Sequence, residues 1–171
     1  MFDKFGEFDS AEELNRAAAA QKAEGDEEAL YALAEENGIE AVEVDDYLDG
    51  CVEELVNPLM AAMGKLKVEK EELKSFDGMI MDDWIMYVTE CVSESEDMQM
   101  AVRKKGNSLK DCIVTLLKWS FENAQPVGED IAKAAGVPGT LAGNVKLGIP
   151  NMRKAKEIIK EYYGRKIDES V

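Results

Sequence analysis

The stretch SLKDCIVTLLKWSF, residues 108–121, decides the fold class. Its apolar residues recur at intervals of three and four, which places them on one face of an α-helix: Leu109, Cys112, Ile113, Leu116 and Leu117. Ser108, followed three residues later by Asp111, is typical of a helix start because a serine oxygen can accept a bond from a free backbone N–H. The stretch therefore predicts an amphipathic helix that packs against other helices.

Similar periodicity along most of the chain predicts an all-α protein. Further helices are expected over about 10–23, 26–37, 40–48, 51–73, 81–92, 96–104, 128–135 and 151–163. Pro58 is expected to start a turn or to kink the helix that contains it, because proline has no backbone N–H. The aromatic residues Trp84, Trp119 and Phe121 are expected to fill the core.

Charge is distributed unevenly and suggests two regions. Residues 1–60 hold 3 basic and 18 acidic residues, residues 61–101 hold 4 and 10, and residues 102–171 hold 13 and 8. Turn residues at 75–78 interrupt the helical pattern near the middle of the chain. We expect two small helical subdomains: an acidic region at 1–74, a linker at 75–79, and an amphipathic bundle at 80–171. The two regions either dock on each other or offer two partner surfaces.

One segment of the C-terminal region lacks the helical pattern. The connection 136–150 is rich in glycine and is expected to be irregular, with one short strand allowed near 145–147. It lacks the Gly-Lys-Ser/Thr ending of a phosphate-binding loop, so no nucleotide is expected there. The run 130–137 resembles the start of a helix–turn–helix, but Pro138, Gly139 and Gly143 are expected to break a recognition helix.

The composition excludes several classes of function. Because the chain has no histidine, it offers no imidazole base, serine–histidine triad or histidine-ligated zinc. The formal net charge of −16 repels the phosphates of nucleic acids and anionic lipids, so basic proteins are favoured as partners. No stretch approaches the roughly 20 apolar residues of a membrane span. We expect a non-enzymatic protein that uses no cofactor and contacts no membrane.

The cysteines indicate a reducing environment. Cys51, Cys91 and Cys112 lie far apart, show no Cys-x-x-Cys spacing and follow no candidate signal peptide, which favours free thiols and a cytoplasmic location. Each lies among apolar residues of a helical pattern, so all three are expected to be buried.

Carboxylate pairs in the N-terminal region are the candidate partner-binding residues. They are Glu12, Glu13, Glu27, Glu28, Glu35, Glu36, Asp45, Asp46, Asp49, Glu53 and Glu54. A calcium loop starting at Asp45 fails, because Tyr47 and Val56 stand where its third and twelfth positions need oxygen ligands. No metal site is expected. The acidic residues flank apolar stripes, so they form either a solvated face or a surface for a basic partner.

Basic residues of the last helix are a second candidate site. They are Arg153, Lys154, Lys156 and Lys160. Three interpretations remain open for them: contact with RNA or DNA, contact with the acidic N-terminal region, or a plain solvated face.

The C-terminal part of the chain resembles a known family. A basic stretch at 104–107 leads into a Ser-Leu-x-x-Cys helix start at 108–112, followed later by a Tyr-Tyr pair at 162–163. These features resemble the PcfK-like accessory proteins of conjugative elements and prophages. The resemblance covers roughly the last 70 residues, and Gly-Arg-Lys at 164–166 stands where the family usually has an acidic cluster.

This resemblance implies a protein of a bacterial mobile element. The family includes anti-CRISPR inhibitors of the type II effector nuclease, so inhibition of an RNA-guided nuclease is an implied function. Such nucleases hold nucleic acid in positively charged channels, where an array of carboxylates could imitate phosphates. We expect a protein-binding function for the acidic helices, with nucleic-acid binding by the basic C-terminal helix as the alternative. The oligomeric state is left open.

Overall fold

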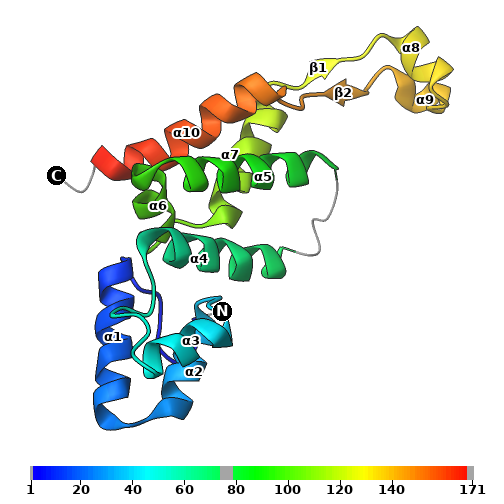
Figure 1. Ribbon diagram of the computed structural model, residues 1–171. Coiled ribbons are helices and arrows are strands. Elements are labelled where there is room, and N and C mark those ends of the chain that lie inside the picture. The colour runs from blue at the N-terminus through cyan, green and yellow to red at the C-terminus, as the bar shows by residue number, and fades with distance from the viewer. Residues whose placement is uncertain (1, 74–78, 169–171) are drawn as a thin grey trace.

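The computed structural model describes residues 2–73 and 79–168, and this part of the chain is almost entirely helical (Figure 1). Ten helices account for 68% of it. They are α1 (Ala11–Glu24), α2 (Glu27–Glu36), α3 (Ala41–Leu48), α4 (Pro58–Glu72), α5 (Met79–Glu94), α6 (Glu96–Arg103), α7 (Leu109–Glu122), α8 (Glu129–Ala134), α9 (Gly139–Ala142) and α10 (Met152–Asp168). The described residues also form two short strands, β1 (Gln125–Pro126) and β2 (Lys146–Leu147). The predicted all-α class with a short strand near 145–147 is confirmed.

Helix starts follow the local capping signals. The Ser10 hydroxyl accepts a bond from Glu13 N at 3.2 Å, and Asp26 caps α2 by accepting from Ala29 N at 2.9 Å. The Ser108 hydroxyl accepts from Asp111 N at 3.0 Å and starts α7 where the sequence predicts it. These side chains satisfy backbone donors that have no partner inside the helix.

The helix predicted over 51–73 begins later than expected. Residues 49–57 form a non-helical connection, and α4 starts at Pro58, with Asn57 as its N-cap. Proline is favoured in this position because the first turn of a helix leaves its N–H groups unpaired. Among the apolar residues before α4, Leu55 and Val56 are buried and Val52 is exposed.

Buried apolar side chains form two cores, and α4 contributes to both. In Figure 1, α4 lies between α1, α2 and α3 on one side and α5, α6, α7 and α10 on the other. The N-terminal core joins α1, α2 and α3 to α4 and includes Leu14, Leu30, Leu33, Val44, Leu55 and Ala61. The C-terminal core joins α4, α5, α6, α7 and α10 and includes Ala62, Leu66, Trp84, Val88, Val102, Leu116 and Ile159. The neighbouring residues Ala61 and Ala62 thus belong to different cores.

The linker expected at 75–79 lies mostly outside the described residues. Residues 74–78 are not described, and Met79 is the first residue of α5. The division of the chain into two regions stays a prediction, although α4, assigned to the first region, also packs in the C-terminal core. None of the helices in the described ranges combines the length and apolar character that a bilayer crossing requires.

Two expectations about burial are wrong. Phe121 is 79% exposed, whereas Trp84 is only 2% exposed and Trp119 packs at the edge of the C-terminal core. Phe121 lies in the last turn of α7, where the chain leaves the bundle for β1. Cys51 is also exposed, because it lies in the non-helical connection and not in a helix; Cys91 and Cys112 are buried as expected.

The glycine-rich connection is more ordered than expected and forms part of an arm. β1 and β2 pair antiparallel, with Gln125 opposite Leu147, and the short helices α8 and α9 lie at the far end of this ribbon (Figure 1). After Pro138 only the four-residue helix α9 forms, and Gly143 is its C-cap. A Cβ on Gly148 would lie 2.0 Å from the Ser120 carbonyl oxygen, so glycine is required where the ribbon meets α7.

Candidate protein-binding surface

The eleven predicted acidic residues lie at several places on the N-terminal helices. Two are in the first turn of α1, four are at the two ends of α2, three are on α3 or at its end, and two are in the connection before α4. Figure 1 shows that α1 begins near α4 and α6, whereas α2 begins at the opposite end of α1. The acidic residues therefore do not form one continuous array.

Two of these acidic residues serve the fold. The Glu13 carboxylate accepts a bond from Asp9 N at 2.7 Å, and the Glu36 carboxylate accepts from Lys4 N and Phe5 N at 2.8 and 3.0 Å. Both are half-buried, while the other nine are exposed. Glu13 and Glu36 hold the segment before α1 and are poorly placed to meet a partner.

Three others converge on one tyrosine. The Tyr31 hydroxyl donates a hydrogen bond to Asp45, which joins α2 to α3. This bond is the main cause of a raised pKa for Tyr31, and the nearby charges of Asp45, Glu27 and Asp49 add to it. We call Glu27, Tyr31, Asp45 and Asp49 the acidic cluster. The contact could not be predicted from sequence, because it depends on how α2 and α3 pack.

Counter-charges are scarce around the acidic residues. Within the described chain, Glu13 is the only one of the eleven that forms an ion pair, with Arg16 at 3.9 Å. Lys22 lies over the Tyr47 ring, with its Nζ 4.2 Å from the ring centroid. The exposed carboxylates therefore create a negative field that is not neutralised locally. Among the described residues, no group of three or more side chains is arranged to hold a metal ion.

Most of the predicted basic residues on α10 have partners nearby. Arg153 and Lys154 both lie close to Glu157, at 3.8 and 3.1 Å. Lys156 Nζ lies 4.4 Å from the centroid of the Tyr87 ring on α5. Only Lys160 of the four makes no such contact with described residues. The described partners lie on α10 and α5, not on the acidic N-terminal helices.

Sequence reasoning missed a buried charged network at the junction of α4 and α6. Lys65 is fully buried; its Nζ lies 2.6 Å from Glu7 Oε1 and donates to the Lys104 carbonyl oxygen at 3.1 Å. Glu69 lies one turn further along α4, and its Oε2 accepts a bond from Leu109 N at 2.9 Å. The only sequence signal is a lysine and a glutamate four residues apart on the buried side of α4.

Burial sets the protonation properties of this network. Desolvation raises the pKa of Glu69 to about 7, even though the nearby Lys65 opposes the shift. Desolvation also lowers the pKa of Lys65, against the stabilising effect of Glu7 and Glu69. Both shifts have the direction expected when a charged form loses its water.

The segment before α1 closes this junction. Glu7 Oε2 accepts a bond from Gly106 N at 3.2 Å, and Asp9 Oδ1 accepts from Lys105 N at 2.9 Å. Residues at the start of the chain thereby pack against the loop between α6 and α7.

Comparison with known proteins adds no relative. No family model, no curated protein and no solved structure matches the chain. The candidate surface rests on its own geometry and charge.

Proposed function

We propose that this protein is a non-enzymatic binding protein that recognises a basic protein partner through the acidic cluster. The observation that carries the proposal is the convergence of Glu27, Asp45 and Asp49 around Tyr31, without a neutralising cation among the described residues. Carboxylates fixed in this way attract a surface rich in lysine or arginine and increase its rate of association.

Tyr31 adds a second mode of recognition. Its ring is half-buried between two packed helices, so little conformational entropy is lost when a partner side chain contacts it. A lysine or arginine can place its cation over such a ring while it also meets the surrounding carboxylates. The cluster therefore favours a side chain that is cationic at its end and apolar along its stem.

An RNA-guided nuclease is the first partner to test. The resemblance of residues 104–113 to PcfK-like proteins supports this choice, and so does the positive charge of the nucleic-acid channel in such enzymes. In this proposal the protein belongs to a mobile element, and its carboxylates occupy positions that phosphates would otherwise take.

Nucleic-acid binding by α10 remains the alternative proposal. It has less support, because Arg153 and Lys154 share Glu157, and Lys156 lies on Tyr87. Phosphate contacts by these side chains would have to replace those interactions. The net charge of −16 also opposes approach to nucleic acid.

The test is cleavage of target DNA by a type II effector loaded with its guide, with and without this protein, at physiological salt. We expect inhibition by the unaltered chain and a loss of at least about tenfold in potency for Glu27→Gln with Asp45→Asn and Asp49→Asn. Inhibition should weaken at higher salt, because screening reduces attraction between exposed charges.

A matched variant separates specific contact from overall charge. Asp82→Asn with Asp83→Asn and Glu90→Gln removes the same number of charges from exposed positions on α5. This control should inhibit like the unaltered chain. Equal loss in both variants would contradict a role for the acidic cluster, and no inhibition at all would remove the nuclease as partner. Binding of the protein to DNA alone, lost on reversing the charges of α10, would favour the alternative.

A further inference from the structure

The arm, which we define as residues 123–150 between α7 and α10, carries strongly exposed apolar side chains (Figure 1). Among the described residues, the four most exposed large apolar side chains lie on the arm or just before it. They are Phe121, Leu147, Ile149 and Ile131, which are 79%, 63%, 63% and 62% exposed. Exposed apolar side chains that gather in one place typically mark a binding surface. The arm is remote from the acidic cluster, so this inference goes beyond the proposed function.

The ribbon of the arm has one apolar face. Gln125 lies opposite Leu147, and Val127 N donates to the Val145 carbonyl oxygen at 2.9 Å, which continues the same register. Side chains alternate along a strand, and residues directly opposite each other share a face. Val127, Val145 and Leu147 therefore lie on one face of the ribbon, with Gln125 as its polar member.

Both edges of the ribbon oppose the addition of a further strand. Pro126 and Lys146 are opposite each other between the hydrogen-bonded pairs, so their backbone groups point outward from the ribbon. Pro126 has no N–H to offer at the β1 edge, and Lys146 places a charged residue on the β2 edge. Proline and lysine are typical of edge strands that avoid edge-to-edge pairing. A partner is therefore expected on the apolar face and not along an edge.

The arm has little core of its own. Its strands have two residues each, and only Ala132, Ala142 and Pro150 are buried among its 28 residues. An isolated two-stranded ribbon is at best marginally stable in water. Such an arm is best stabilised by a partner that is present wherever the chain is made, and a second copy of the chain meets this condition.

Charge also favours a second copy as the partner. The arm holds two acidic and two basic residues, whereas the whole chain has a formal net charge of −16. Glu129 and Lys133 of the arm also form an ion pair at 2.5 Å. Copies of an acidic chain repel each other, and they do so least where the surface is neutral. Figure 1 shows the arm on the far side of the C-terminal helices from α1, α2 and α3, so contact between two arms keeps the acidic helices apart.

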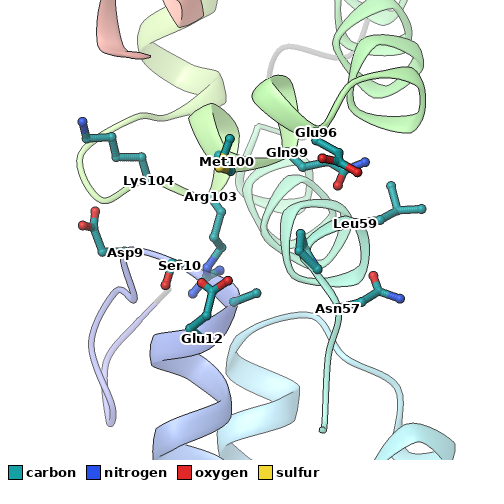
Figure 2. A pocket seen from close by; sticks show the side chains of 12 residues that line it. Asp9, Ser10, Glu12, Asn57, Leu59, Glu96, Gln99, Met100, Arg103 and Lys104 are labelled. Atoms are coloured by element: carbon teal, nitrogen blue, oxygen red, sulfur yellow. The ribbon is translucent and has the colours of Figure 1, made fainter. Parts of the chain in front are cut away.

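The pocket of about 500 Å³ between α1, α4 and α6 is a less suitable contact surface (Figure 2). Its charged lining residues are Asp9, Glu12, Glu96, Arg103 and Lys104. The three carboxylates are exposed, whereas Arg103 is buried and Lys104 is half-buried. Two copies that met at this pocket would bring exposed carboxylates together, which is unfavourable.

We propose that two copies of this chain form a symmetric dimer through their arms. The apolar ribbon faces, with Leu147, pack against each other, and Ile131 on α8 and Leu141 on α9 contact the second copy. In a twofold interface the same patch serves both copies, which suits an apolar surface and not a surface of one charge. A standard interface takes about 20–30 residues from each partner, and the 28 residues of the arm are of this number.

The experiment measures the molar mass of the full chain by sedimentation velocity at physiological salt. Between about 1 and 100 µM we expect a change from the mass of one chain to twice that mass, with a dimer Kd of about 10 µM or tighter. Because the contact is apolar, about 0.5 M NaCl should leave this Kd unchanged or lower it, whereas binding by the acidic cluster weakens with salt. A single chain at every concentration, or a dimer that dissociates at higher salt, would overturn the proposal.

Substitutions locate the interface at positions where the fold is not at risk. Leu147→Glu and Ile131→Glu each place a charge on an exposed apolar position of the arm. Met86→Glu on α5 is the matched control, because Met86 is 56% exposed and the change in charge is the same. We expect at least tenfold weaker dimerisation for each arm variant and no change for the control. Equal weakening in all three variants, or none in the arm variants, would contradict contact through the arms.

Hydrogen exchange followed by mass spectrometry tests the contact without substitution. Backbone N–H groups of residues 123–150 should exchange more slowly at about 100 µM than at about 1 µM, because the dimer covers them. Exchange in α1, α2 and α3 should not depend on concentration. Slower exchange in those helices, with no change on the arm, would place the interface elsewhere and overturn the proposal.

Discussion

Arg103 on α6 and Asn37 at the end of α2 are joined by a hydrogen bond of 2.8 Å, although 66 positions separate them in the chain. Both side chains are buried, and Asn37 Nδ2 also donates to the Leu33 carbonyl oxygen at 2.8 Å. Asn37 therefore connects the N-terminal core to α6 through polar contacts that exclude water.

Asn37→Ala is expected to lower the free energy of unfolding by about 2–4 kcal/mol, because it removes the one hydrogen-bond acceptor that the described residues offer to the buried Arg103 guanidinium. Urea denaturation followed by circular dichroism measures this change. Asn144→Ala, at an exposed position, is the control and should stay within about 0.5 kcal/mol of the unaltered protein. Similar losses of unfolding free energy in both variants would show that the hydrogen bond between Arg103 and Asn37 does not stabilise the fold.

Gly38→Ala is expected to destabilise the protein strongly. Gly38 has a φ of +71°, and a Cβ there would lie 2.3 Å from the Gly64 carbonyl oxygen on α4. Two effects therefore add: backbone strain and separation of α2 from α4. Gly143→Ala is the matched control, because a Cβ at Gly143 meets nothing within 4 Å. A thermal melt should show a clear drop in Tm for the first variant and little change for the second; equal Tm values would contradict the close approach.

Glu69 should make stability depend on pH. Its pKa is raised from an ordinary value of 4.5 to about 7 in the folded protein, so the folded state binds more protons than the unfolded state between these pH values. Stability must then fall as pH rises from about 4.5 to about 7. Glu69→Gln removes this dependence. As the pH rises from about 4.5 to about 7, the unaltered protein should therefore lose about 3 kcal/mol of unfolding free energy relative to Glu69→Gln.

The control for this measurement is Glu71→Gln, on the exposed side of the same helix. Chemical denaturation of all three proteins at several pH values gives the comparison. A constant difference between Glu69→Gln and the unaltered chain would show that Glu69 titrates alike in the folded and unfolded states.

The three thiols should differ in reactivity. Cys51 is exposed, whereas Cys112 is buried and desolvation raises its pKa to about 12. Since the thiolate is the reactive form, an aromatic disulfide reagent should modify Cys51 rapidly and reach Cys91 and Cys112 only after unfolding. Cys51→Ser should remove the rapid phase. A rapid phase that persists in this variant would contradict the burial of the other two.

The elements that the sequence predicts well are those whose signals are local. Ser10, Asp26 and Ser108 each cap a helix within three residues, and the apolar spacing of 108–117 identifies the buried face of α7. Both signals act between residues that are neighbours in the chain, so no knowledge of packing is needed.

The features that the sequence did not reveal depend on packing between distant segments. Phe121 continues the pattern of α7, but the bundle ends before it; Cys51 precedes a helix that starts only at Pro58. The acidic residues were predicted as a group, yet only the fold of α2 against α3 brings Asp45 to Tyr31. Lys65 and Arg103 are buried, although nothing in their local sequence indicates burial.

The contacts of Glu7 and Asp9 also set an order of events during synthesis. Their backbone partners, Gly106 and Lys105, follow 99 and 96 positions later. At typical rates of translation, Glu7 and Asp9 wait about 5 to 20 seconds before these partners are made. Helices α1 to α3 are made within that interval, but Glu7 and Asp9 can dock on the loop between α6 and α7 only after residues 105 and 106 have been made.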